Sequence, residues 1–391
     1  MMTSNTLNAL CRTEFPLEQD LIHLNHAAVG PWPMRAVNAV KRFAEENMYQ
    51  GSQNYLNWLK TENQLRLRLR QLINAASVNE IALSKNTSEA LSIVAYGIRW
   101  QSGDEVVISN QEFPSNRIVW ESLQAKFGVI VKVADLSNDD PEAAIIDCLS
   151  SRTRIVSVSS VQYGTGLKLD LNRLGNEIKS RDILFCVDAI QSVGATPLDV
   201  QRDQIDFLMA DGHKWMLGPE GLALLYVKKE VQDRLELNQY GWHMVKDRGN
   251  FDRHDWEPVD SAVRFECGSP NMLATHALNE SVGLLLEIGM DQIETLIKGK
   301  IRKLQEHLQA LKDIEIITNL EDNRLAGILT FRSRQIDSRL LFEELQSHNI
   351  LCAARGGGIR FSPHFYTPDE KLAAACEKLA TACEKQKSIS G

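Results

Sequence analysis

The spacing of hydrophobic and polar positions divides the chain into an N-terminal helical part, a long strand–helix alternation and a mixed C-terminal part. Pro33 suits the first turn of a helix predicted over residues 33–49. Leucines among polar and basic residues predict a second helix over 56–74. From residue 80 onward short apolar runs alternate with helical segments, and we predict strands at 81–83, 105–109, 129–133, 154–159, 183–187, 207–210 and 222–227.

This alternation predicts an α/β fold in two domains. About 25 residues per strand–helix unit imply right-handed crossovers and a mostly parallel sheet covered on both faces. We expect a large domain over residues 20–270 and a smaller α+β domain over 271–391, to which the arm 1–19 is assigned. A helix at 274–288 should lead into the small domain, with further helices at 290–311, 339–348 and 369–385 and strands at 314–317, 326–331, 350–353 and 358–362.

Two polar residues follow neighbouring apolar runs at the place where each predicted strand ends. Asp188 follows the run 183–187, and Lys214 follows the run 207–210 in the segment DGHK. A lysine picked at random extends its ammonium into water, whereas a lysine delivered into apolar surroundings tends to lose its proton and become a nucleophile. An acid and a lysine at adjacent strand ends describe a cofactor site at the carboxyl edge of a parallel sheet. Pyridoxal phosphate needs this pair, because a lysine holds its aldehyde as a Schiff base and a carboxylate keeps its ring nitrogen protonated.

Composition and charge narrow the class of protein. A chain of 391 residues that is 43% hydrophobic can bury a substantial core. A net charge of −8 without a concentrated Lys/Arg run argues against nucleic-acid binding, and no apolar stretch is long enough to predict a membrane span. The polar N-terminus lacks the layout of a signal peptide, so we expect a cytoplasmic protein. Seven scattered cysteines without a CxxC pair predict reduced thiols and no metal site.

Three spaced motifs resemble the class V aminotransferase family. They are DAIQSVG at 188–194, GHKW at 212–215 and GPEG at 218–221. The family includes cysteine desulfurases, kynureninase-like enzymes and isopenicillin N epimerase-like proteins. The resemblance implies a fold-type-I pyridoxal-phosphate enzyme with a mostly parallel seven-stranded sheet, a small-molecule amino acid substrate, and a homodimer with shared active sites.

The resemblance also implies roles for individual residues. Lys214 would carry the cofactor as an aldimine and move the substrate's α-proton, while Asp188 would stabilise the protonated ring. Hydroxyls at a helix start can cradle a phosphate, although a simple helix cap would look the same locally. The further residues expected to bind the cofactor are Thr87, Ser88, Phe113, Gln162, Gln191, His213 and, contributed by the second chain of a dimer, Ser269.

On the substrate side, Arg360 matches the family's carboxylate-binding arginine, whose planar fork suits a carboxylate. A salt bridge on the surface or between subunits is the alternative role for this arginine. His26 lies in a segment of small residues beside the expected pocket, where it either contacts substrate or is a buried histidine bonded to backbone.

Three positions depart from the cysteine desulfurases in this family. Phe113 stands where those enzymes place a stacked histidine, and Asp211 stands where they place a phosphate-binding hydroxyl. The interval 356–359 contains no cysteine and is too short for their mobile loop, and Cys352 lies in an apolar run where a packing role is expected. The persulfide-forming mechanism is therefore disfavoured.

We predict a pyridoxal-phosphate enzyme that acts on an amino acid, with a class V aminotransferase as the main interpretation. The alternative is C–S lyase or cysteine desulfurase-like chemistry, or epimerisation, since all of these begin from the same Schiff base. A non-catalytic binding protein that retains the cofactor fold is the hypothesis from another class. The combination of lysine, aspartate and carboxylate-binding arginine argues against it.

Overall fold

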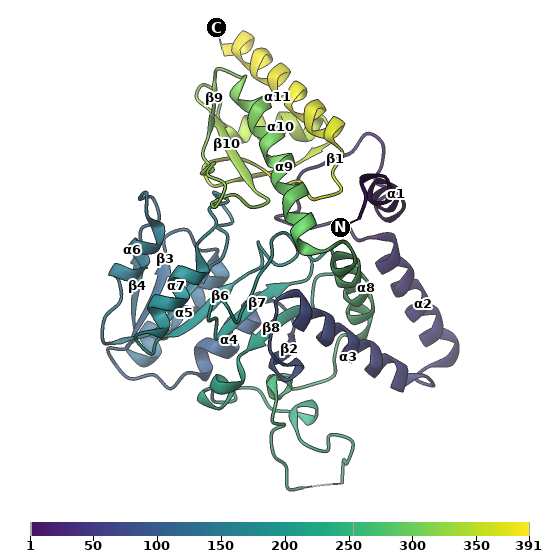
Figure 1. Cartoon of the computed structure of the whole chain (residues 1–391), viewed down its shortest axis with the longest axis vertical. Coiled ribbons are helices and arrows are strands. Elements are labelled where there is room, and N and C mark those ends of the chain that lie inside the picture. Colours follow the sequence, from purple (N-terminus) through teal and green to yellow (C-terminus); the bar gives the residue numbers. More distant parts are fainter. Residues whose placement is uncertain (1, 253, 391) are drawn as a thin grey trace.

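The computed structural model describes residues 2–252 and 254–390, which form a large and a small α/β unit placed one above the other (Figure 1). The large unit contains a seven-stranded sheet in the order β2-β8-β7-β6-β5-β3-β4. All neighbours are parallel except around β8, which is antiparallel to both β7 and β2. The strands are β2 (Ile81–Ser84), β3 (Glu105–Ser109), β4 (Ile130–Ala134), β5 (Thr153–Ser159), β6 (Leu184–Asp188), β7 (Phe207–Asp211) and β8 (Ala223–Val227).

Alternating side chains of these strands enter two separate cores, which is why both faces of the sheet are covered. Leu208 packs into the core under α3, α6, α7 and α8, whereas its neighbours Phe207 and Met209 pack into the core under α4 and α5. This is the period of two expected for a strand. The helices are α3 (Tyr55–Leu72), α4 (Thr87–Gly97), α5 (Pro114–Phe127), α6 (Pro141–Asp147), α7 (Leu171–Lys179) and α8 (Met272–Ile288).

The small unit is built on a four-stranded antiparallel sheet in the order β12-β13-β10-β9. The strands are β9 (Ile314–Ile316), β10 (Leu329–Ser333), β12 (Ala353–Arg355) and β13 (Gly358–Phe361), and the helices are α9 (Met290–Gln309), α10 (Ser338–Ser347) and α11 (Asp369–Ser390). Near the N-terminus α1 (Ser4–Glu14) is followed by β1 (Ile22–His23), which pairs in parallel with β11 (Ile350–Leu351). The strand β1, which precedes the large unit in the sequence, therefore belongs to the small unit.

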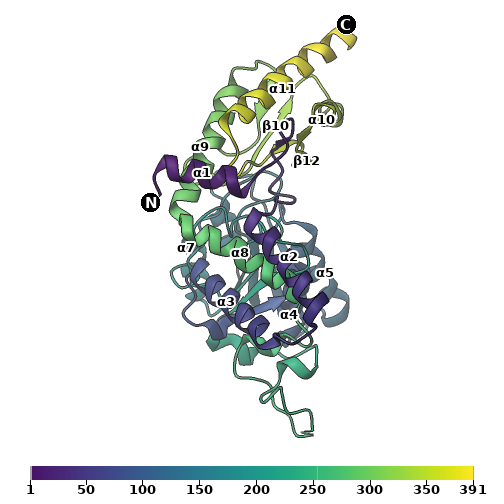
Figure 2. The same ribbon diagram turned by 90° about the vertical axis from the view of Figure 1, so that its right-hand side faces the viewer.

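The predicted architecture is confirmed, with differences at particular elements. Helix α8 packs against α2 (Met34–Gln50) and α3 and shares the core of the large sheet (Figure 2). By its packing α8 is part of the large unit, although the predicted domain boundary at residue 270 assigns it to the small domain. The strand predicted over 350–353 is two short strands, because β11 pairs with β1 while β12 pairs with β13. The charged segment after β8 forms a short 3₁₀ helix, Lys229–Arg234. Among the described helices, none is both long and apolar enough to cross a membrane.

Candidate active site

A cavity of about 360 Å³ opens at the carboxyl edge of the large sheet, beside the small unit. Asp188 ends β6 and Asp211 ends the adjacent strand β7, so both side chains reach this edge. Because β2 runs parallel to β7 across the antiparallel β8, the start of α4 arrives at the same edge. The cavity is lined by Ala27, Ala28, Asn86, Thr87, Ser88, Phe113, Ser115, Tyr163, Asp188, Ile190, Gln191, Asp211, His213, Lys214, Arg355 and Arg360.

Lys214 lies in this cavity on the turn that follows β7, with 8% of its surface exposed. Burial lowers the pKa of its ammonium to about 8, because removal from water disfavours the charged form. The Asp188 carboxylate opposes this shift and the Arg360 guanidinium adds to it. The Nζ atom lies 5.6 Å from the centroid of the Phe113 ring. A lysine with this pKa has a substantial fraction of free amine at mildly alkaline pH, as a nucleophile or base requires.

Asp188 is fully buried at the end of β6. Burial raises the pKa of its carboxyl to about 7, a hydrogen bond from the Ile190 amide at 3.1 Å opposes this, and the buried Glu112 carboxylate adds to the rise. The positive charge of Lys214 also lowers this pKa. A carboxylate in this position is stabilised further by any cation brought into the cavity.

The start of α4 brings hydroxyl groups to the opposite wall. Asn86 caps this 11-residue helix by accepting a hydrogen bond from the Glu89 amide. The Thr87 hydroxyl oxygen accepts a hydrogen bond from the Asp211 amide at 3.1 Å, which leaves its own proton to donate, and the Ser88 and Ser115 hydroxyls lie 2.7 Å apart. Hydroxyls at a helix N-terminus suit a phosphate group.

Asp211 and His213 face one another at this wall. The Oδ1 atom of Asp211 lies 3.1 Å from Nδ1 of His213 without the alignment of a hydrogen bond, and neither atom has a hydrogen-bond partner among the described residues. The aspartate that stands in place of the desulfurases' phosphate-binding hydroxyl therefore has the His213 imidazole as its neighbour.

The remaining cofactor candidates of the large unit that line the cavity are Phe113 and Gln191. Phe113 is 39% exposed, and its ring meets Tyr163 edge to face at 5.1 Å between centroids. Gln191 donates from Nε2 to the Ala27 carbonyl at 3.0 Å and accepts at Oε1 from the Trp215 indole at 2.9 Å. Gln191 thus connects the Ala27 carbonyl in the cavity wall with the indole of Trp215, the residue that follows Lys214.

Arg360 reaches the cavity from β13 of the small unit and is 3% exposed. One arm of its guanidinium, Nη1, donates to the Tyr163 carbonyl at 2.8 Å, and Nε is buried without a partner in the described part of the chain. Burial lowers its pKa to about 10, and the neighbouring Arg355 lowers it further. An arginine held by one arm can offer the rest of its fork to a carboxylate.

Three predicted residues do not line the cavity. His26 is fully buried behind it, with Nδ1 donating to the Ser362 carbonyl and Nε2 accepting from the Tyr366 hydroxyl, so both nitrogens are occupied and a substrate contact is not available. Gln162 is also fully buried and donates to the Ser159 carbonyl. Ser269 lies on a separate surface hollow, so its predicted role stays a prediction about a second chain.

Asn86, Ser115, Arg355 and Tyr163 line the cavity but were not assigned to it from the sequence. Tyr163 stands directly after Gln162, which was expected here, and begins the turn 163–165. For Tyr163 the only available signal was the choice between two neighbouring positions in the segment VQYGTG.

The lining of the cavity in the described part of the chain includes no cysteine. Cys352 is buried in the core of the small unit, and burial raises the pKa of its thiol to about 12. The hairpin between β12 and β13 is closed by two glycines, Gly356 and Gly357, with φ of 62° and 79°. A Cβ added to Gly356 would lie 2.2 Å from the Gly164 carbonyl oxygen, so this turn packs closely on the segment that carries Tyr163.

Comparison with known proteins assigns the family. The profile of the family "Aminotransferase class-V" matches residues 22–366. The chain belongs to this family. A probable cysteine desulfurase of Methanothermobacter thermautotrophicus is 30% identical over 384 residues, covering 92% of this chain and 94% of that protein. A probable cysteine desulfurase of Pyrococcus abyssi is 28% identical with the same coverage.

Solved structures confirm the fold. The cystine C–S lyase C-DES in complex with its product cysteine persulfide superposes with a TM-score of 0.87 at 22% identity, covering 94% of this chain and 99% of that chain. A mutant of C-DES with glycine covalently linked to its PLP cofactor gives a TM-score of 0.88 at 22% identity, covering 94% and 98%. The cysteine desulfurase CsdA of Escherichia coli gives a TM-score of 0.87 at 22% identity, covering 98% and 99%.

The class V enzyme is therefore pyridoxal-phosphate-dependent, and the donor set of the cavity fits this group. An amine, a buried acid, and a helix start with free hydroxyl protons surround one space of sufficient size, and buried polar atoms of Asp211, His213 and Arg360 point to a missing polar partner. When bound, pyridoxal phosphate draws electrons from the α-carbon of an amino acid. The residues that would hold it are Thr87, Ser88, Phe113, Asp188, Gln191, His213 and Lys214.

Proposed function

We propose that this enzyme is a C–S lyase that removes the sulfur substituent of an amino acid by β-elimination. The observation that carries the proposal is a class V cavity with Lys214, Asp188 and Arg360 together but without a cysteine in its described lining. Two proteins to which the chain is similar are named probable cysteine desulfurases, and a third is named a cystine C–S lyase. This proposal replaces transamination, the main interpretation of the sequence, by its stated alternative.

Arg360, Lys214 and Phe113 have different roles in the proposed elimination. Arg360 binds the α-carboxylate of the substrate with the arm that Tyr163 does not occupy. Lys214, whose pKa near 8 leaves a usable fraction of free amine, takes the α-proton. The electron pair of the C–H bond then becomes the second bond between Cα and Cβ, and the pair of the Cβ–S bond leaves with sulfur. Phe113 provides an apolar wall and transfers no proton.

Arg355 suggests which sulfur amino acid is preferred. It lines the same cavity as Arg360 but is exposed, and its Nη1 atom donates only to the adjacent Ala354 carbonyl among the described contacts. Two guanidinium groups in one cavity suit a substrate with two carboxylates, such as the disulfide cystine. We propose cystine, with cysteine as the poorer substrate.

The protein-bound persulfide route requires an accessible thiolate of low pKa. Cys352 is buried with a raised pKa, and the short turn at 356–357 between β12 and β13 carries no cysteine. Elimination instead releases the sulfur fragment directly and leaves 2-aminoacrylate, which water hydrolyses to pyruvate and ammonia. The proposed enzyme is a homodimer whose second chain supplies Ser269 to the phosphate, as the resemblance implies.

Products decide between the routes. The enzyme loaded with cofactor should convert cystine to pyruvate, ammonia and a persulfide, without alanine, and addition of a keto acid should not increase turnover. Arg355→Ala should raise KM for cystine by roughly 5- to 20-fold, the value of one charged contact, with less effect on cysteine. Arg334→Ala, at an exposed arginine on the small unit, is the matched control. Alanine from cysteine, or amino transfer to a keto acid, would overturn the proposal.

A further inference from the structure

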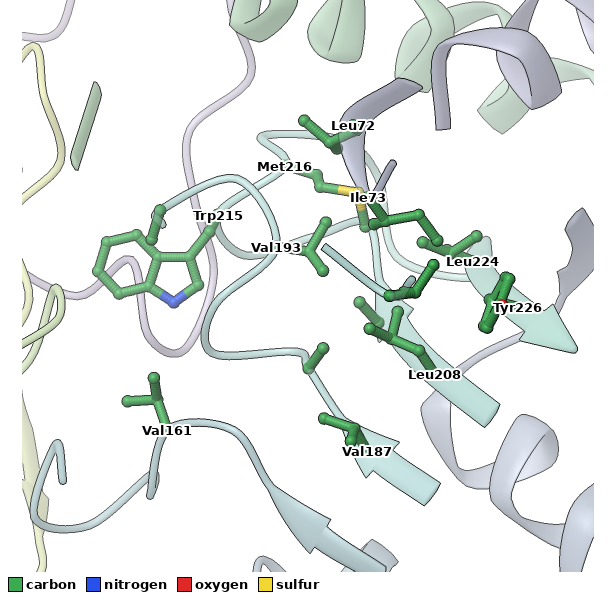
Figure 3. Packing of buried hydrophobic residues seen from close by; sticks show 14 of the residues in the cluster. Leu72, Ile73, Val161, Val187, Val193, Leu208, Trp215, Met216, Leu224 and Tyr226 are labelled. Atoms are coloured by element: carbon green, nitrogen blue, oxygen red, sulfur yellow. The ribbon is translucent and has the colours of Figure 1, made fainter. Parts of the chain in front are cut away.

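The residue after Lys214 is tied to three separate parts of the chain. Trp215 is fully buried, and its indole nitrogen donates to Gln191 of the large unit. Figure 3 shows its ring and the Met216 side chain extending to opposite sides of their segment. The ring rests on Gly327 of the small unit so closely that an added Cβ there would lie 2.2 Å from its Cη2 atom.

The backbone of Trp215 is held by a histidine of the small unit. His364 is fully buried, and its Nε2 lies 3.1 Å from the Trp215 carbonyl oxygen. Its Nδ1 accepts a hydrogen bond from the Phe365 amide at 2.8 Å, which fixes the proton on Nε2. The imidazole is neutral because burial lowers its pKa to about 3. It therefore donates to Trp215 across the whole physiological range.

His364 also stands close to Arg360 along the chain. Only three residues separate them, and Ser362 in this interval is anchored by the Leu24 carbonyl and the Ala27 amide. The segment that presents Arg360 is thus rigidly connected to His364, and His364 is bonded to the residue next to Lys214. The two groups that must meet the same amino acid, one at its carboxylate and one at its α-proton, are linked by this short path.

We infer that Trp215 and His364 are positioning residues that fix the distance between the Arg360 guanidinium and the Lys214 amine. Proton transfer requires the amine within about 3 Å of the α-carbon's proton, and a displacement of about 1 Å can cost about 100-fold in rate. Trp215 and His364 are both fully buried, so loss of the His364 donor leaves the Trp215 carbonyl unpaired. The inference rests on the roles proposed for Lys214 and Arg360, and not on which bond breaks afterwards.

The test measures proton transfer without elimination. L-Alanine has no leaving group, so exchange of its α-proton for deuterium in heavy water, followed by NMR with the cofactor-loaded enzyme, reports on Lys214 and Arg360 alone. His364→Phe removes the donor and keeps a ring, whereas His364→Gln retains an N–H that can reach the carbonyl. His307→Phe, at an exposed histidine of α9, is the matched control.

We expect His364→Phe to lower the maximal exchange rate roughly 10- to 100-fold, with little change in the alanine concentration that gives half the maximal rate. His364→Gln should stay within about threefold of the parent, as should His307→Phe. If His364→Phe does not fold, His364→Asn, whose shorter amide falls short of the carbonyl, takes its place with the same expected outcomes. Exchange within threefold of the parent, or a glutamine variant as slow as phenylalanine, would overturn the inference. Normal exchange in an enzyme that eliminates no sulfur would refute only the proposed function.

Discussion

Asp188 should destabilise the protein when the cofactor is absent, and by an amount that depends on pH. Its carboxyl is fully buried, and its pKa is about 7 in the folded chain against 3.8 for an ordinary aspartate. Between these two pH values the unfolded chain has released a proton that the folded chain still holds. A raised folded pKa contributes stability that is fully present below pH 3.8 and is lost as pH rises through 7.

The size of the Asp188 pKa shift determines how much folding stability is lost as the pH rises. About three pKa units correspond to roughly 4 kcal/mol at most. From pH 5 to pH 8 the loss is about 2 to 3 kcal/mol, because part of it has already occurred at pH 5. Asp188→Asn keeps the shape and the oxygen that accepts from the Ile190 amide, but it does not titrate. At pH 8 it should therefore raise the melting temperature of the cofactor-free protein by about 3 °C more than at pH 5.

The contribution of Lys214 to folding stability changes with pH in the opposite direction to that of Asp188, and over a different pH range. Its folded pKa of about 8 lies below the ordinary 10.5, so its contribution is fully present above pH 10.5 and is lost as pH falls through 8. The two residues also attract one another, so Asp188→Asn and Lys214→Met should not be additive, and the double variant measures the coupling.

The assay is differential scanning calorimetry or fluorescence of the cofactor-free protein at pH 5 and pH 8. Asp139→Asn, at an exposed aspartate in a loop, is the control and should change neither melting temperature. An equal effect of Asp188→Asn at both pH values, or a destabilisation at pH 8, would refute the reasoning. It would mean that the attraction to Lys214 outweighs the cost of burial.

Three further outcomes follow from the described contacts. Cys352→Ser should leave turnover within about threefold of the parent, because this thiol is buried away from the cavity; loss of activity, with alanine formed from cysteine, would restore the desulfurase mechanism. Mixing Lys214→Ala and Ser269→Asp chains, each inactive alone, should restore about a quarter of the activity if dimers share sites, and an active monomer in sedimentation would contradict this. Gly327→Ala should cost about 1 to 3 kcal/mol by forcing a Cβ against Trp215, measured as a lower melting temperature.

The strands of the large sheet could be predicted because most of them are short, buried apolar runs. The edge strand β4 is partly exposed but is equally short and apolar. The predicted run 105–109 is the observed β3. The predicted run 183–187 is displaced by one residue from β6, and the predicted run 207–210 ends one residue before β7 does. This accuracy matters for the site, since a parallel sheet brings its strand ends to one edge and the residues after them into one cavity. Lys214 and Asp188 therefore follow from hydrophobic pattern and elementary cofactor chemistry.

The side chains that the sequence misplaced depend on partners far away in the chain. Whether His26 contacts substrate is decided by Ser362 and Tyr366, more than 330 residues later, which occupy both of its nitrogens. Whether Gln162 or Tyr163 faces the cavity depends on the orientation of one turn, which no periodic pattern marks. Ser269 requires a second chain, and a single chain offers no contact that could test it.

There is also a physical reason why the sequence motifs do not distinguish transamination from elimination. The residues proposed to hold the cofactor, from Thr87 to Lys214, would serve both reactions, so motifs built from them identify the family and leave the reaction open. Under the proposed function, the reaction is selected by what surrounds the sulfur atom of the substrate. We propose that the exposed Arg355, the Phe113 ring and the nearby glycine turn at 356–357 form these surroundings. Arg355 and the turn lie outside the residues proposed to hold the cofactor, and the described lining beside them offers positive charge but no thiol.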